Sequence, residues 1–213
     1  MLTYEQVFEN NKNWLFQKKL GNLRFFDDLS TGQNPDFLYI GCSDSRVPAE
    51  QFMGAQPGEV FVHRNVANVV NSADLNASSV IEYAVGHLEV EHIIVCGHYQ
   101  CGGVASAMEN NDAGMLNPWL QNIRDVYRLH REELDKIVDV GARYDRLVER
   151  NVEEQCLNVY KMAVVQKAIH GGYRPKIHAW VFNVKSGEII DLKLDLEKKL
   201  SNKQGIYDLG FEK

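Results

Sequence analysis

The chain has 213 residues, 45% of them hydrophobic and 24% charged, the balance of an ordinary soluble globular protein with room for a sizeable core. Its net charge of −6 argues against nucleic acid or an anionic membrane as the main partner, because either would favour a basic face. No run reaches the roughly 18 apolar residues of a membrane span. The N-terminal stretch also lacks the apolar region of a secretory signal. A cytoplasmic location is therefore expected.

Residues 3–19 are expected to form an amphipathic helix. Val7, Trp14 and Leu15 recur there at helical spacing among Lys, Glu and Asn. The turn-rich stretch STGQNPD separates this helix from the rest of the chain. The pattern fits two interpretations equally: an arm that packs on a second subunit, or an ordinary helix on its own domain.

Short apolar runs alternate with helical patterns after this loop. Strands are expected at 37–41, 59–64 and 92–96, followed by a closing pair at 176–184 and 188–194. Helices are expected at 76–89, from about 103, at 116–132 and at 143–169. This alternation predicts an α/β fold, with a mainly parallel β-sheet flanked by helices. Without a repeat or strong linker, 1–213 is expected to form one domain, with 1–30 as an N-terminal helical arm and 31–213 as the α/β core.

Two short motifs follow the ends of expected strands. CSDSR places Cys42, Asp44 and Arg46 after the first strand, and GHYQCGG places His98 and Cys101 after the third. Ligands of open parallel sheets bind just beyond the carboxyl ends of strands, so the motifs are expected to meet at one edge. Two thiolates and an imidazole suit Zn²⁺, and three protein ligands with one open position are the pattern of a catalytic zinc site.

Asp44 leaves two alternatives open. It is either a fourth ligand that closes the site, or it is held away by Arg46 in a bidentate charge-assisted pair while water takes the fourth position. An ordinary surface ion pair, worth little, is the third interpretation, and a nearby metal weakens it. Cys96, inside a strand, and Cys156, on a helix face, are interpreted as core thiols. Four cysteines in a chain of this size do not indicate a disulfide scaffold.

These two motifs, with PGEVFVHRNVANVV, IEYAV and EHIIVCGH in the expected order, resemble the signatures of the β-class carbonic anhydrases of bacterial type. The resemblance is most specific from Gln33 to Gly103 and continues more loosely to about residue 193. It implies that three residues bind one Zn²⁺ per subunit, namely Cys42, His98 and Cys101. It also implies that Asp44 and Arg46 form the catalytic pair, with Asp44 on the metal in a closed state.

The resemblance further implies a substrate site and an assembly. Gln33 matches a glutamine that family members direct at the substrate from the neighbouring subunit. The residues matching a small apolar CO2 pocket and the glycines beside it are Phe61, Val66, Tyr83, Gly102 and Gly103. Family members are homodimers or dimer-based homotetramers whose N-terminal arm wraps the partner, which favours the arm interpretation of the first helix.

The implied activity is the zinc-dependent, reversible hydration of CO2 to bicarbonate and a proton. Zinc lowers the pKa of bound water to about 7, and zinc-bound hydroxide would attack CO2 while Asp44 and Arg46 orient it. One alternative is a hydrolase of the same fold acting on carbonyl sulfide or carbon disulfide. Another is a structural zinc or redox-responsive interaction protein, against which Arg46 argues because it is available to hold Asp44 back.

The sequence departs from one family feature. Some bacterial members bind bicarbonate at an inhibitory site built from a tryptophan, an arginine and a tyrosine. Here Arg64 is kept, but Tyr39 and Phe182 stand at the other two positions. Because Phe182 lacks a hydroxyl for the anion, we expect that bicarbonate alone does not stabilise a closed state.

Overall fold

The computed structural model describes residues 1–173, 175–200 and 204–211, and the chain forms two compact units, 1–34 and 35–213. The smaller unit consists of α1 (Tyr4–Gly21) and the short α2 (Phe25–Leu29). A capping box starts α1: the Thr3 hydroxyl accepts from the Gln6 N–H, and the Gln6 side chain accepts from the Thr3 N–H. None of the side chains described for α1 is buried, so its apolar residues remain exposed on this chain.

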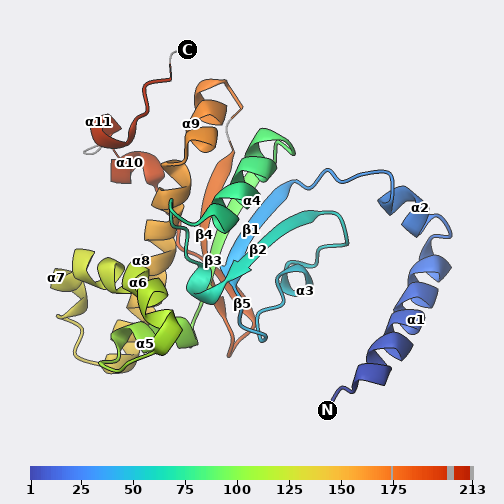
Figure 1. The fold of residues 1–213 in the computed structure, drawn as a ribbon, viewed down its shortest axis with the longest axis horizontal. Coiled ribbons are helices and arrows are strands. Elements are labelled where there is room, and N and C mark those ends of the chain that lie inside the picture. Colours follow the sequence, from blue (N-terminus) through green and yellow to red (C-terminus); the bar gives the residue numbers. More distant parts are fainter. Residues whose placement is uncertain (174, 201–203, 212–213) are drawn as a thin grey trace. The chain divides into compact units, whose positions relative to one another are not determined.

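The larger unit is built on a five-stranded sheet with the order β2-β1-β3-β4-β5 (Figure 1). The strands are β1 (Phe37–Cys42), β2 (Val60–Asn65), β3 (His92–His98), β4 (Lys176–Asn183) and β5 (Glu188–Asp191). The first four pair in parallel, and β5 runs antiparallel to β4. The carboxyl ends of β1, β2 and β3 therefore lie at one edge of the sheet.

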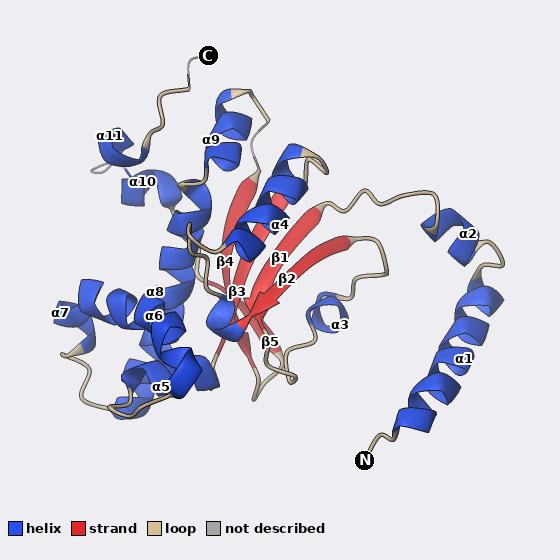
Figure 2. Ribbon diagram, in the orientation of Figure 1, coloured by secondary structure: helices blue, strands red, loops and turns tan. Residues whose placement is uncertain are grey.

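Helices flank the sheet (Figure 2) and carry the chain between its parallel strands, which hairpin turns cannot do. The longer helices are α4 (Leu75–Gly86), α6 (Asn117–Leu129), α8 (Val140–Tyr160) and α9 (Ala163–His170). The shorter elements are α3 (Ala49–Met53), α5 (Gly102–Met108), α7 (Arg131–Leu134), α10 (Leu196–Leu200), α11 (Gln204–Tyr207) and the 3-10 turns η1 (Val66–Asn68) and η2 (Gly114–Leu116).

The core lies on both faces of the sheet because side chains alternate along each strand. Leu38 and Ile40 of β1 belong to the larger cluster, which α4, α5, α6 and α8 complete. Tyr39, between them, belongs to a smaller cluster on the opposite face with Ile94 and residues of α3. Strands covered on both faces explain why the apolar runs in the sequence are continuous rather than alternating.

The expected α/β fold is confirmed, and the thiols of Cys96 and Cys156 lie in the core as interpreted. The single helix expected at 143–169 is wrong: the chain turns to extended geometry at Met162, with ψ of 135°, and restarts as α9. Periodicity does not reveal α2, α3, α7, α10 and α11, each of five residues or fewer. The assignment of one domain stays a prediction.

No helix in the described part of the chain is both long and apolar enough to cross a membrane. The cytoplasmic location expected from the sequence stays a prediction.

Replacing Gly97 tests how tightly β3 packs on α8. A Cβ atom there would lie 2.6 Å from Val152 Cγ2 and 3.3 Å from Val148 Cγ1. Such overpacking beside His98 is expected to lower the free energy of unfolding of Gly97→Ala by about 1–3 kcal/mol, measured by urea denaturation. Gly86→Ala is the control, because its Cβ would come no closer than 3.4 Å to Val164. Equal losses in the two variants would contradict this account of the packing.

Candidate active site

Three potential metal ligands converge at the carboxyl edge of the sheet. Cys42 is the last residue of β1, His98 is the last residue of β3, and Cys101 immediately precedes α5. Gln100, with φ of 61°, makes the left-handed step that turns the chain back between His98 and Cys101. One donor atom from each ligand residue lies within 4.8 Å of the others, and all three residues are buried.

The three donors fit zinc. The Cys42 and Cys101 sulfurs are 3.8 Å apart, and two sulfurs each about 2.3 Å from a tetrahedral zinc ion would be separated by about 3.8 Å. The Nδ1 atom of His98 is 3.0 Å from the Tyr99 carbonyl, so it carries the proton and donates. The fully buried Nε2 atom is left with a lone pair and no partner among the described residues, a state that a metal ion relieves.

The environment separates the acidities of the two thiols. The pKa of Cys42 is lowered, chiefly by a hydrogen bond from the Cys101 thiol, and also by His98 and by the Ala67 N–H at 3.4 Å. The pKa of Cys101 is raised, because its proton is shared with the adjacent Cys42 sulfur. A metal ion binds such cysteines as thiolates, so zinc binding at this pair is coupled to the loss of thiol protons.

Asp44 is held by Arg46 rather than placed among the metal donors. The guanidinium donates from Nε to Oδ1 at 3.0 Å and from Nη2 to Oδ2 at 2.7 Å, and the Arg46 backbone N–H donates to Oδ1 at 2.9 Å. These bonds hold the pKa of Asp44 well below its usual range. Its Oδ2 atom nevertheless lies 3.7 Å from His98 Nε2, so the carboxylate borders the metal position. The bidentate pair of the second alternative is therefore present, and the open fourth position on the metal stays a prediction.

Several supporting groups were not evident from the sequence. Arg64 donates to the carbonyls of Cys42 at 2.9 Å and Asp44 at 2.7 Å and so fixes the loop after β1. The Tyr144 hydroxyl donates to the Cys101 carbonyl at 2.6 Å. Ala67, with φ of 63°, directs its N–H at Cys42. The one signal near Ala67 was the following Asn68, a residue type that tolerates left-handed geometry.

The structure separates the substrate residues expected from the resemblance. Val66 and Gly103 lie together, since a Cβ at Gly103 would be 2.8 Å from Val66 Cγ1, and Gly102 opens α5 beside them. The rings of Phe61 and Tyr83 contact each other at 5.7 Å. Phe61, however, is the second residue of β2, about 13 Å from the carboxyl end of that strand. Gln33 lies in the N-terminal unit. Their roles stay predictions.

Tyr39 and Phe182 lie in the smaller core cluster. Phe182 stacks on Phe52 at 4.5 Å, and Tyr39 meets the edge of Phe52 at 6.1 Å. Arg64 already donates to two backbone carbonyls. This packing supports core roles for both aromatic residues, and the expected absence of bicarbonate-driven closure stays a prediction.

The sequence and the fold are similar to those of known proteins. The carbonic anhydrase family profile matches residues 37–189. A carbonic anhydrase of Emericella nidulans is 56% identical over 207 residues, which cover 97% of this chain and 91% of that protein. A β-carbonic anhydrase of Aspergillus fumigatus, 36% identical, superimposes with a TM-score of 0.89 over 96% of this chain and 98% of that one. A tetrameric β-carbonic anhydrase of Sordaria macrospora, 40% identical, superimposes with a TM-score of 0.85 over 90% of this chain and 97% of that one.

The chain therefore belongs to the β-carbonic anhydrases, zinc-dependent lyases that interconvert CO2 and bicarbonate. The Cys42–His98–Cys101 centre is where the described residues can hold that zinc ion.

Zinc content tests the centre directly. The native protein is expected to retain one zinc ion per subunit after dialysis, and Cys101→Ala to retain almost none, because two remaining donors do not hold a tetrahedral ion tightly. Metal analysis by plasma mass spectrometry, with protein concentration from amino-acid analysis, gives the ratio. Cys156→Ala is the matched control, since it also removes a buried thiol but lies outside the centre. Equal zinc loss in both variants would refute the assignment.

Proposed function

We propose that the enzyme hydrates CO2 at the Cys42–His98–Cys101 centre, with Asp44 and Arg46 orienting the attacking oxygen. The observation that carries the proposal is the position of the Asp44 carboxylate, next to the metal position but held by two guanidinium hydrogen bonds. A closed structural zinc site would need a fourth protein ligand, and Asp44 is the nearest candidate. Because Asp44 is hydrogen-bonded to Arg46 instead, the fourth coordination position is left for water, which favours a catalytic site.

Each residue has a distinct task in this proposal. Zinc, when bound, supplies the Lewis acidity that makes hydroxide available from water near neutral pH. Cys42 and Cys101 contribute two negative charges, which make the metal less acidifying than three neutral imidazoles would. Asp44 remains a carboxylate across the physiological range because Arg46 lowers its pKa, so it can only accept a hydrogen bond. It thereby holds the O–H of the nucleophile and leaves the oxygen lone pair directed at CO2.

The substrate niche is proposed to draw on two subunits. Val66, Gly102 and Gly103 lie next to Ala67 and Cys101 and offer a small apolar wall, which suits an uncharged linear molecule. Phe61 lies near the start of β2, too far from the carboxyl end of that strand to complete the wall, and Tyr83, which contacts Phe61 from α4, is exposed. We therefore assign both to the niche of a partner subunit, together with Gln33, for which the sequence resemblance itself implies that position.

The N-terminal unit supports an assembly of at least two chains. The relatives from Sordaria macrospora are described as tetrameric. In the present chain, α1 leaves a set of large apolar side chains exposed: Val7, Phe8, Trp14, Leu15, Phe16 and Leu20. An exposed apolar surface of this kind is unfavourable in water and marks an interaction site. A homodimer or dimer-based homotetramer, with this arm against the partner, would cover it.

Stopped-flow CO2 hydration from about pH 6.5 to 9 tests the activity. The zinc-replete enzyme is expected to show rapid hydration that rises with pH, as hydroxide becomes more available. Asp44→Asn should keep its zinc and lose activity by about 10–100-fold, because an amide can also donate and no longer imposes one orientation.

Zinc loss or failure to fold in Asp44→Asn, with the native protein inactive, would instead indicate a structural site. A native protein that turns over carbonyl sulfide but not CO2 would favour the hydrolase alternative.

Sedimentation equilibrium of arm variants tests the assembly. Phe8 and Phe16 of α1 are 53% and 59% exposed. Phe8→Ser combined with Phe16→Ser is expected to shift the native oligomer toward smaller species, since apolar contacts with the partner are lost. Lys12→Ser is the control, because it alters a solvated residue of the same helix whose partner among the described residues is the exposed Glu9. An unchanged mass for the double variant would exclude the arm from the interface.

A further inference from the structure

The turn between β2 and α4 presents a backbone N–H to one of the metal ligands. Ala67 and Asn68 have φ of 63° and 49°, so two consecutive non-glycine residues are left-handed. This geometry costs about 1–2 kcal/mol per residue and persists only where neighbouring groups hold it. Its result is the contact of the Ala67 N–H with Cys42 Sγ at 3.4 Å.

Two side chains donate hydrogen bonds to the two peptide groups that flank Ala67. The peptide that carries the Ala67 N–H also carries the Val66 carbonyl, which accepts from the Trp119 indole N–H at 2.8 Å. The next peptide carries the Ala67 carbonyl, which accepts from Asn151 Nδ2 at 3.0 Å. Trp119 comes from α6 and Asn151 from α8, so two helices far along the chain fix the orientation of a single N–H.

Asn151 is itself oriented by a second amide. Gln155 Nε2 donates to Asn151 Oδ1 at 3.0 Å, which leaves the Asn151 amino group to face the Ala67 carbonyl. Gln155 Oε1 accepts from the Val70 N–H at 2.9 Å and from Asn158. Asn151 and Gln155 are each 1% exposed, one turn apart on α8. Buried amides of this kind specify geometry, because a mismatch leaves polar groups unpaired.

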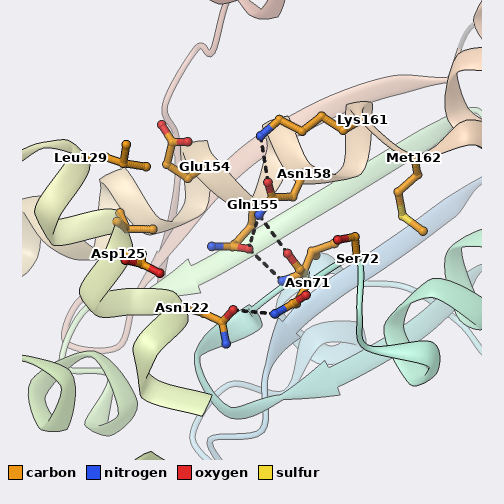
Figure 3. A pocket seen from close by; sticks show the side chains of 12 residues that line it. Asn71, Ser72, Asn122, Asp125, Leu129, Glu154, Gln155, Asn158, Lys161 and Met162 are labelled. Atoms are coloured by element: carbon orange, nitrogen blue, oxygen red, sulfur yellow. Dashed lines mark hydrogen bonds between the residues drawn. The ribbon is translucent and has the colours of Figure 1, made fainter. Parts of the chain in front are cut away.

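The outer end of this amide chain borders a pocket of about 250 Å³ (Figure 3). Gln155 and Asn158 line it from α8, and Asn71 and Asn122 are hydrogen-bonded to each other across it. Asn158 also donates to the Val70 carbonyl at 2.9 Å. Hydrogen bonds thus hold the turn at Val70, beside the pocket, as well as at Ala67, beside Cys42.

We propose that Trp119 and Asn151 are positioning residues for the metal centre: they hold the Ala67 N–H on the sulfur of Cys42, and Gln155 sets the orientation of Asn151. An N–H donor withdraws charge from a thiolate, so this contact controls how strongly Cys42 donates to the metal. The inference rests on the proposed zinc centre. A merely structural role would stabilise the fold without altering the metal.

Cobalt substitution separates the two roles, because the thiolate-to-cobalt charge-transfer band reports on sulfur donation. Trp119→Phe keeps an aromatic ring but removes the N–H, and Asn151→Ala removes the hydrogen bond to the Ala67 carbonyl. Both should shift the band to lower energy, because the sulfur then keeps more of its charge. Both should also weaken zinc binding by about tenfold in chelator competition, because the Ala67 N–H no longer holds Cys42 Sγ in place. Gln155→Met should do so less, since it acts through Asn151.

Two variants serve as controls. Trp180→Phe makes the same chemical change in β4, where no described hydrogen bond involves the indole. Gln166→Ala removes another amide that is 1% exposed and that bonds the Tyr207 carbonyl and the Leu209 N–H. Both should leave the cobalt band and zinc affinity unchanged, whatever they do to the free energy of unfolding.

The outcomes are distinguishable. An unmoved band in Trp119→Phe would overturn the positioning role. So would zinc affinities that fall in proportion to the loss of unfolding free energy, by the same relation in the variants and in the controls. A native protein without any thiolate–cobalt band would refute the proposed centre itself. Should Asn151→Ala fail to fold, Trp119→Phe alone decides, because it preserves most of the packing volume.

Discussion

The parallel pairing of β1 with β3 is the constraint on which the site depends. Its register sets Gly41 opposite Cys96, so the strands end together and release Cys42 and His98 at the same edge. Side chains alternate with a period of two, and a slip by one residue would turn Cys42 to the opposite face. The close approach of α8 to Gly97 secures β3 in this position. Strand pairing, rather than loop conformation, thus fixes two of the three ligands.

Arg46 joins the two motifs that this pairing brings together. Its guanidinium holds Asp44 of its own loop and also donates to the Gln100 carbonyl in the turn that leads to Cys101, at 3.0 Å. The carboxylate is therefore neutralised by a cation tied to the far side of the site. A group with such a partner stays ionised beside two thiols, because the favourable pair offsets the repulsion between negative charges. Arg46 thus both neutralises the charge of Asp44 and fixes the position of its carboxylate.

The sequence predicted the site best where potential ligand side chains directly follow the end of an expected strand. Cys42, Asp44 and His98 follow apolar runs that predict buried strands, so their meeting could be expected from topology alone. The break at Met162 could not, because helical periodicity continues across it and tertiary packing of α9 decides the conformation. The left-handed Ala67 was equally hidden, since alanine carries no signal for that geometry. Niche residues such as Phe61 came from resemblance only, and pairing along β2 separates them from the centre.

The family match covers the part of the chain that contains the candidate metal centre. The profile spans residues 37–189 and so includes every part that one chain brings to the metal, from Cys42 in β1 to Asn151 in α8. The helix α1 lies outside it and contributes no buried side chain among those described. Its large apolar side chains are exposed, which is the observation behind the proposed contact with a partner chain. The candidate centre is assembled by the fold of one chain, and in our proposal the arm depends on contacts with a partner chain.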